Sequence, residues 1–303
     1  DDMRGSNPHD TLFKQVFKNF DNIRDLVKEV LPKDLANSID YDNIEYPNTG
    51  YIEETSADSY SDLVVKTKLK DTDSDILIYF LVEHKSYTDK NALLQLLKYM
   101  VRIWEDKKLN TTKSKGFIPV IPILFHQANK QWTYDNTFSM YFPKLDKRLS
   151  PYIPDFTTLI YDLPKKSRND IIGNIYYKMS VLLMKYIRNE DISQTLQELS
   201  VLLNQLKDTG YKEEFCLIIA TYVYTFRKDI KPDKIINELS NPKLKGAFMT
   251  IADRLKEEGR QEGRQEGEKK KAVETAKKLK EKGMDIELII EVTGLSKEEI
   301  EKL

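Results

Sequence analysis

Two apolar runs joined by a polar turn carry acidic and basic residues that could do chemistry together. Residues 63–69 and 76–82 have the aliphatic and β-branched composition of strands, and the second run is apolar enough to be buried on both faces. The residues between the runs are Lys, Asp, Ser and Thr, which favour turns. A symmetric hairpin with this turn places Asp62, at the start of the first strand, opposite Glu83, at the end of the second.

This pairing brings two carboxylates side by side, and like charges directly opposite each other destabilise a sheet. A positive group should therefore lie between them. Side chains alternate along a strand, so Lys85 projects to the same face as Glu83 and His84 projects to the other. Two carboxylates and an ammonium predict a site for a hard cation such as Mg²⁺, which suits phosphodiester hydrolysis, with Lys85 orienting the water or stabilising developing charge. The alternative is a surface ion triad without chemistry.

A helix is predicted soon after the hairpin, over residues 91–104. Gln95, Tyr99 and Arg102 lie on one stripe of this helix, at spacings of four and three residues. A glutamine and a tyrosine beside a metal-bound phosphate can bind the substrate backbone or the attacking water; the alternative is an ordinary helix flank. The broad apolar face of the helix consists of Leu93, Leu96, Leu97, Met100 and Ile103.

The order of these residues resembles the PD-(D/E)XK nuclease superfamily, including the QxxxY helix of its RecB-like branch. More narrowly, the chain resembles the recombination-promoting nuclease (Rpn), or transposase, family of bacteria, and the likeness covers most of its length. Many members of that family have Gln where this chain has Lys85, but Lys is usual in the superfamily, so this departure favours activity. The matching segments are SDL at 61–63, LVEHKS at 81–86, LLKYMVRIW at 96–104, PHDTLFKQVF at 8–17 and the tail.

The resemblance implies a metal-dependent DNA endonuclease that promotes recombination. The cofactor would be Mg²⁺, or Mn²⁺ or Ca²⁺ in its place, held by Asp62, Glu83 and the backbone carbonyl of His84. Superfamily members often carry an acidic residue on the first helix, so Asp10 either reaches this site as an accessory acid or stabilises the helix macrodipole. The alternative function is a catalytically silent DNA-binding or interaction protein that keeps the fold.

By the same resemblance, Lys85 would position the nucleophile, and Gln95 and Tyr99 would contact the phosphate.

The charge distribution along the chain indicates where DNA would bind. Residues 1–84 hold 9 basic and 18 acidic residues, whereas residues 85–150 hold 12 basic and 5 acidic residues, so a polyanion is favoured downstream of the motif. A solvated face is the alternative, and this pattern cannot distinguish DNA from RNA. The expected substrate-binding residues are Arg102, Lys107 and Lys108.

Composition limits the remaining possibilities. With 303 residues, 40% hydrophobic and 32% charged, the chain can form one large globular domain or two ordinary ones. It has no apolar run long enough for a membrane span and no signal-peptide core, so we expect a protein of the bacterial cytoplasm that does not contact membranes. The single cysteine, Cys216, lies in an apolar run and is expected to be a buried thiol, not a nucleophile.

The order of predicted elements defines the fold class as α/β. A first helix over 8–31 and strands over 51–54, 117–125 and 157–163 complete a restriction-endonuclease-like core, a mixed sheet flanked by helices. Two prolines, Pro119 and Pro122, predict an edge position or a bulged path for the 117–125 strand. His126 and Gln127 follow that strand, where His126 is either a cleft residue or a turn histidine.

The rest of the chain is predicted to be helical. Segments 171–187, 192–206, 213–227 and 232–239 have helical periodicity, and they could pack on the core, clamp substrate or contact another subunit. The predicted domains are a nuclease core at 8–165, an all-helical region at 166–255, a polar linker at 256–268 and a helical tail at 269–303.

The linker repeats EEGR-like units with a glycine every fourth residue, which predicts a marginal, solvated helical connector or, alternatively, a glycine stripe for close helix contact. The tail has a basic helix and two short helices, and it could be half of a helix-turn-helix. Because two short helices cannot bury a core alone, we expect dimerisation or docking instead, and a homodimer held partly by residues 269–303. Its apolar residues are Ile286, Leu288, Ile289, Ile290, Val292, Leu295, Ile300 and Leu303.

Overall fold

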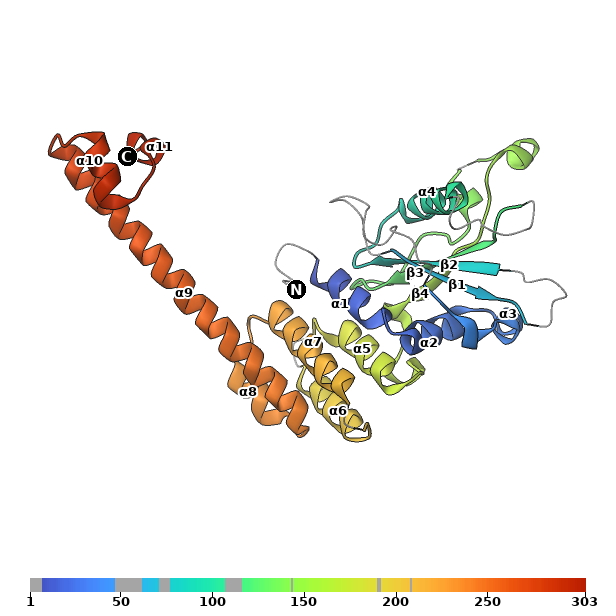
Figure 1. Cartoon of the computed structure of the whole chain (residues 1–303). Coiled ribbons are helices and arrows are strands. Elements are labelled where there is room, and N and C mark those ends of the chain that lie inside the picture. Colours follow the sequence, from blue (N-terminus) through green and yellow to red (C-terminus); the bar gives the residue numbers. More distant parts are fainter. Residues whose placement is uncertain are drawn as a thin grey trace. The chain divides into compact units, whose positions relative to one another are not determined.

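The chain forms two compact units, Asp1–Lys245 and Gly246–Leu303. The first has a mixed sheet with helices on both faces, as the sequence predicts, and the second is helical (Figure 1). The computed structural model describes residues 7–46, 62–70, 77–106, 116–142, 144–189, 192–207 and 209–303, without the side chains of residues 62, 77–79 and 81. The predicted strand at residues 51–54 lies outside these residues.

The sheet has four strands in the order β1-β2-β3-β4. β1 and β2 are antiparallel, as a hairpin requires, and β3 and β4 follow parallel to β2. The carboxyl ends of β2, β3 and β4 therefore lie at one edge, together with the start of β1. The strands span Asp62–Lys68, Leu77–Lys85, Val120–His126 and Leu159–Asp162.

The hairpin register is the predicted one, because Asp62 pairs with Glu83 and Lys68 pairs with Leu77. β2 is also buried as predicted. Phe80 and Val82 are fully buried, and burial continues through the polar residues at its end. The predicted hairpin is therefore confirmed over the paired residues.

The expected edge position of β3 is wrong, because β3 pairs with β2 on one side and β4 on the other. The physical reason lies in the register. β4 joins only at Ile123, one residue after Pro122, so the proline stands where β3 has a single paired neighbour. Pro119 precedes the strand altogether. The missing amide hydrogens thus do not interrupt a central part of the sheet.

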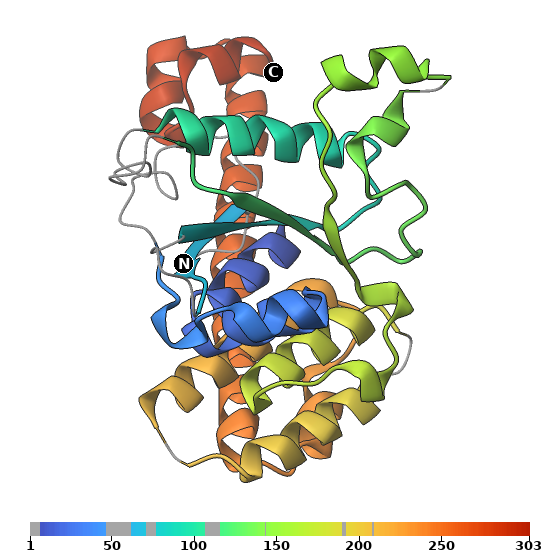
Figure 2. The same ribbon diagram turned by 90° about the vertical axis from the view of Figure 1, so that its right-hand side faces the viewer.

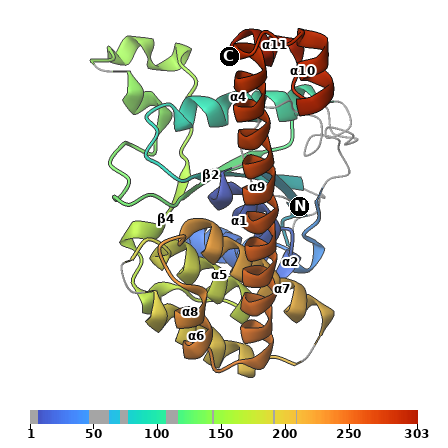
Figure 3. The same ribbon diagram turned by 90° about the vertical axis from the view of Figure 1, so that its left-hand side faces the viewer.

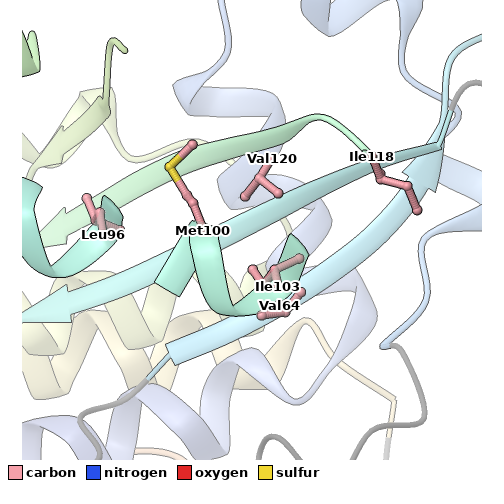
Figure 4. Packing of buried hydrophobic residues seen from close by; sticks show 6 residues of the cluster. All are labelled: Val64, Leu96, Met100, Ile103, Ile118 and Val120. Atoms are coloured by element: carbon pink, nitrogen blue, oxygen red, sulfur yellow. The ribbon is translucent and has the colours of Figure 1, made fainter. Parts of the chain in front are cut away.

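α4, residues Ala92–Glu105, covers one face of the sheet (Figure 2). It begins and ends within a residue of the prediction, and its apolar face packs on β2 and β3. Figure 4 shows how residues from α4, β1, β3 and the segment just before β3 meet in one buried cluster, which consists of Val64, Leu96, Met100, Ile103, Ile118 and Val120.

The opposite face is covered by α1 and α2, Pro8–Phe17 and Phe20–Val30, where the sequence predicts one continuous helix. The single helix is wrong because Asn19 ends it. Its side chain accepts hydrogen bonds from the amides of Asp21 and Asn22 and so caps a new helix, an arrangement that competes locally with helix continuation. The apolar spacing runs unbroken across the junction, which conceals the break. A short helix, α3, follows at Lys33–Ser38.

The predicted helical region is confirmed, and α5 and α7 pack against α1 within the first unit. The single cysteine, Cys216, is buried in α7 as expected. These helices are Ile175–Tyr186 (α5), Ser193–Asn204 (α6), Gly210–Phe226 (α7) and Pro232–Glu238 (α8).

α9, Pro242–Glu281, runs through the glycine repeat as one helix of 40 residues. The helical connector is therefore confirmed. Apart from the nearby backbone of α9 itself, no atom in the described part of the chain lies within 4 Å of the position that a Cβ would take at Gly259, Gly263 or Gly267, so the structure gives the alternative glycine stripe no contact to serve.

The tail buries its own core, which contradicts the expectation that its apolar residues need another partner. The end of α9, which was predicted from the sequence as a basic helix but not counted toward the core, supplies the third helix, and α10 (Ile286–Thr293) and α11 (Lys297–Glu301) pack on it (Figure 3). Leu288 and Val292 stay exposed at 38% and 59%. A homodimer through residues 269–303 therefore stays a prediction, and less exposed apolar area is available for its interface than the sequence suggested. The cluster consists of Ala276, Ile289, Leu295 and Ile300.

Candidate active site

The register fixes the backbone of the candidate site. Asp62 and Glu83 are directly paired at the edge where β1 begins and β2 ends. Directly opposed Cβ atoms in an antiparallel pair lie about 4.5–5.5 Å apart, a separation at which two residues can bind one cation. The side chain of Asp62 lies outside the described residues, and its role as a ligand stays a prediction.

Glu83 is a carboxylate in an unusual environment. It is 0% exposed; Oε1 is ion-paired with Lys85 Nζ at 3.2 Å, and Oε2 has no hydrogen-bond donor among the described residues. Burial raises the pKa of Glu83 to about 7; the ammonium of Lys85 acts in the opposite direction, and the charges of Asp10 and Asp89 add to the increase. A buried carboxylate with an unused lone pair is a suitable ligand for a divalent cation.

Lys85 lies beside Glu83, on the same face, as period-2 alternation requires. Its side chain is 2% exposed, and Nζ lies 3.2 Å from Glu83 Oε1, 3.2 Å from Asp89 Oδ2 and 2.6 Å from Gln95 Oε1. Burial alone would lower the pKa of Lys85, but the charges and hydrogen bonds of Glu83 and Asp89 outweigh it and raise the pKa. The predicted positive group therefore lies next to Glu83.

α4 delivers the two predicted polar residues to the same place. Gln95 accepts from Lys85 Nζ, and its amide donates to the hydroxyl of Tyr99 at 3.0 Å. The guanidinium of Arg102 lies 5.7 Å from the centre of the Tyr99 ring and is exposed. One chain of contacts thus runs from Glu83 to Tyr99. The other expected substrate contacts, Lys107 and Lys108, fall outside the described residues.

Asp10 approaches the site from the other side of the sheet. It lies in the first turn of α1, where it suits the helix macrodipole, and its Oδ1 is 2.6 Å from Nδ1 of His84. Its charge also contributes to the raised pKa of Glu83. Both roles considered from the sequence are therefore compatible with its position. The ring of His84 is buried against Phe13, and its carbonyl as a metal ligand stays a prediction.

The ring of His84 belongs to a buried network of hydrogen bonds. Its Nε2 lies 2.9 Å from Gln127 Oε1, and Gln127 Nε2 donates to the carbonyl of Met184 at 3.1 Å. His9 is part of the same network through the hydroxyl of Tyr222, at 2.7 Å. Burial and the charges of Arg188 and His84 lower the pKa of His9 to about 3, so His9 is neutral. This network joins α1 and the sheet to α5 and α7.

Sequence reasoning missed the role of several residues at this edge. Asp89 contacts Lys85, and Thr88 hydrogen-bonds His126, which in turn lies 2.9 Å from Asp162. His126 is fully buried at the end of β3, so neither the open cleft nor the simple turn considered for it describes its position. Asp89 carried a usable signal, because it lies four residues after Lys85 and just before a predicted helix.

The described side chains do not form a complete metal site. No group of three His, Cys, Asp or Glu side chains among them is arranged to hold a metal ion. The carboxylate expected from Asp62 is the missing member. The fit to a divalent cation therefore depends on the buried carboxylate of Glu83, whose Oε2 has no donor among the described residues, and on the backbone pairing that brings Asp62 opposite.

The raised pKa of Glu83 predicts a pH dependence of folding stability in metal-free protein. A carboxyl with a pKa of 4.5 when unfolded and about 7 when folded stabilises the fold fully below pH 4.5, and this stability is lost as pH rises through 7. Glu83→Gln removes the titration, so between pH 4.5 and pH 8 the wild type should lose on the order of 3 kcal/mol more than the variant. Urea unfolding in EDTA at both pH values measures this. Equal pH dependence in both proteins would contradict the buried carboxyl, and Glu45→Gln, at an exposed ion pair with Lys66, is the control.

Comparison with known proteins identifies the family of the chain. Residues 7–214 match the family described as "Putative transposase, YhgA-like", and residues 269–303 match the "Rpn/YhgA-like nuclease family, C-terminal HTH domain". The chain is 27% identical to "Recombination-promoting nuclease RpnA" of Escherichia coli K12, over 98% of this chain and 97% of the relative. It is 26% identical to "Recombination-promoting nuclease RpnC" of the same strain, over 100% and 98%.

A third relative differs in its name. The chain is 27% identical to "Inactive recombination-promoting nuclease-like protein RpnE" of Escherichia coli K12, over 97% of each protein. No solved structure matches the chain. Fold, strand-end cluster and relatives define an α/β protein of a nuclease family. The chain belongs to the YhgA-like transposase family, which includes the Rpn nucleases, as the sequence motifs predict.

The match of residues 269–303 corrects the interpretation of the tail. The sequence favoured dimerisation over a helix-turn-helix, but this segment matches a helix-turn-helix domain. The structure explains why the short helices suffice: α9 completes their core, and Gly294 ends α10 in a left-handed conformation (φ 69°) that turns the chain into α11. None of the helices in the described ranges combines the length and apolarity that a membrane crossing requires.

Proposed function

We propose that this protein is a Mg²⁺-dependent DNA endonuclease with a restriction-endonuclease-like core. The observation that carries the proposal is Glu83, a fully buried carboxylate that pairs with Asp62 in the sheet, is ion-paired with Lys85 through Oε1, and has no donor at Oε2 among the described residues. The core order supports it, because an antiparallel hairpin with the acidic residues is followed by a helix and a parallel strand. Cleavage of supercoiled plasmid in Mg²⁺, and its loss in EDTA, is the test.

The residues that would hold the cation are Asp62, Glu83 and the carbonyl of His84, with Asp10 as an accessory acid near Glu83. Mg²⁺ prefers carboxylate and carbonyl oxygens, and Mn²⁺ or Ca²⁺ accept the same ligands. When bound, the cation would polarise the scissile phosphate and lower the pKa of a bound water. Folding keeps Glu83 buried with Lys85 as its charged partner and no donor at Oε2 among the described residues, so lone pairs are available for that purpose.

Lys85 would orient the attacking water and stabilise negative charge on the phosphate as the bond to the leaving oxygen breaks. Gln95 holds its ammonium at 2.6 Å and is itself bonded to Tyr99. Lys85, Gln95 and Tyr99 are thus arranged as one unit before substrate arrives. In this proposal Gln95 and Tyr99 contact the phosphate backbone, which keeps the reacting phosphorus near the carboxylates.

A catalytically silent protein is the second candidate, and the relative named inactive favours considering it. The two differ in what Glu83 does. In an active nuclease a divalent cation should stabilise the fold through Glu83, whereas in a silent protein that keeps only the fold, adding Mg²⁺ leaves the melting temperature unchanged. The relatives named recombination-promoting nucleases support DNA as the substrate and recombination as the setting.

DNA binding is proposed for two parts of the chain. The tail matches a helix-turn-helix domain, a fold that reads the major groove. The basic segment after the motif is proposed to hold the phosphate backbone beside the active site. Arg102 is the described member of its expected contacts, and it is exposed at the end of the Gln95–Tyr99 stripe.

Neutralising the basic segment should weaken DNA binding without changing sequence preference. With Arg102, Lys107 and Lys108 all changed to Gln, binding to unrelated duplexes should weaken equally, and the slope of log K against log salt should become shallower by about 2–3. Fluorescence anisotropy over a salt series measures both. An unchanged slope would place the phosphate contacts elsewhere. The matched control neutralises three exposed lysines outside the segment, Lys18, Lys33 and Lys70.

A further inference from the structure

Three polar side chains form a row at the carboxyl ends of the parallel strands. The register pairs Lys85 of β2 with His126 of β3, and His126 with Asp162 of β4. Paired residues on neighbouring strands project to the same face, so the row lies on the face that α4 covers. His126 and Asp162 are 0% and 6% exposed, and neither has a part in the chemistry proposed above.

Hydrogen bonds run from this row to the residues that follow β2. Asp162 Oδ1 is 2.9 Å from Nδ1 of His126, and its Oδ2 accepts from the amide of Trp132 at 3.0 Å. An ionised carboxylate can only accept, so Nδ1 carries a proton, and in the neutral ring Nε2 accepts. The group facing Nε2, at 3.2 Å, is the hydroxyl of Thr88. Thr88 is therefore anchored to the interior of the sheet.

The next residue reaches the proposed active site. Asp89 Oδ2 lies 3.2 Å from Lys85 Nζ, and Asp89 Oδ1 accepts from the amide of Asn91 at 2.9 Å, where α4 begins. Asp89 is thus held between the Thr88 anchor on one side and the helix start on the other. Its side chain is 17% exposed, so it approaches Lys85 from the rim of the site.

Lys85 needs such a partner because its other anionic neighbour has a second task. If the carboxylate of Glu83 coordinates a cation, its lone pairs turn from Lys85 to the cation, and the like charges repel the ammonium. Gln95 is neutral and comes from a different element. Asp89 is the described carboxylate that can keep Lys85 in place without belonging to the proposed ligand set.

We propose that Thr88 and Asp89 are positioning residues for Lys85, and that His126 and Asp162 hold them in place. The consequence for cleavage rests on the proposed function, but the geometry does not. Thr88 anchors Asp89, Asp89 orients the ammonium, and Lys85 performs the chemistry. A purely structural role for Thr88 would affect folding stability and leave Lys85 unaffected.

The first test measures the accessibility of Lys85 without any substrate. The rate at which acetic anhydride modifies Lys85 is followed by quantitative mass spectrometry, with exposed Lys98 as the internal reference. Thr88→Val and Asp89→Asn should each raise the relative rate about fivefold, the effect of losing one hydrogen bond. Thr88→Ser keeps the hydroxyl and should stay within about twofold of wild type.

Thr158→Val is the matched control, because Thr158 is fully buried beside β4 and its hydroxyl has no hydrogen-bond partner among the described residues. It should leave the labelling of Lys85 unchanged. Melting temperatures show whether each variant folds. Unchanged Lys85 labelling in folded Thr88→Val and Asp89→Asn overturns the proposal, and so does a Thr88→Ser variant that behaves like Thr88→Val.

The second test links the positioning residues to cleavage. In single-turnover assays Thr88→Val and Asp89→Asn should each slow cleavage about fivefold with the Kd for DNA unchanged, and the double variant should be no slower than Asp89→Asn. Independent, additive losses overturn the proposal. If the wild type does not cleave DNA, the proposed function fails and the labelling experiment alone decides the positioning role.

Discussion

Glu83→Gln should abolish Mg²⁺-dependent DNA cleavage, lowering the rate by about 10³-fold or more. The substitution keeps the shape of a side chain that is 0% exposed and removes the charge that would bind the cation. Because burial disfavours the ionised carboxylate more than Lys85 stabilises it, the variant should fold at least as well as the wild type at pH 8. Single-turnover cleavage of a labelled duplex measures the loss.

The same variant separates loss of metal from loss of structure. Mg²⁺ should raise the melting temperature of the wild type at pH 8 and leave that of Glu83→Gln unchanged, since a ligand stabilises only the state that binds it. Glu45→Gln, which removes an exposed carboxylate paired with Lys66, should keep both responses. A Glu83→Gln protein that still cleaves in a Mg²⁺-dependent way would contradict the ligand role of Glu83.

Lys85→Met should lower cleavage about 10²-fold or more while DNA affinity stays the same. The long apolar side chain fills the space of a lysine that is 2% exposed, but it cannot orient water or stabilise charge on the phosphate. It also leaves Glu83 without its ammonium neighbour, which raises the pKa of that carboxyl further. Activity of the variant should therefore recover in part as pH rises.

Lys18→Met is the control for this prediction, because Lys18 is exposed and lies outside the basic segment. It should change neither the cleavage rate nor its pH dependence. Cleavage rate and DNA affinity are measured on the same duplex, so that a binding defect is not mistaken for a chemical one. If Lys85→Met cleaves at the wild-type rate, the ammonium has a structural role and the assignment of Lys85 is wrong.

The central part of the site could be predicted because its signals are local. Asp62 precedes the first of two apolar runs and Glu83 follows the second. The runs are symmetric about a polar turn, and in a hairpin that symmetry sets the register. Period-2 alternation then places Lys85, and helical spacing places Gln95 and Tyr99 on one stripe. The structure brings the described members of this set together as expected.

The row formed by Lys85, His126 and Asp162 could not be predicted, because its contacts depend on parallel strands that are far apart in the chain. No local sequence pattern indicates that His126 pairs with Lys85 or that Asp162 pairs with His126. Thr88 and Asp89 looked like an ordinary loop before a helix. The prediction for the tail failed for a related reason. The two short helices were considered without the end of α9, which packs on Ile289 and Ile300.

The most direct test of the central claim is plasmid cleavage by wild type and Asp62→Ala, each in Mg²⁺ and in EDTA. Asp62 is the proposed ligand whose role depends on register alone, because it is paired with Glu83 in the sheet. We expect the wild type to nick or linearise supercoiled plasmid in Mg²⁺, and both the variant and the EDTA samples to leave it intact. Cleavage that is indifferent to both EDTA and Asp62→Ala would contradict a metal-dependent nuclease at this site.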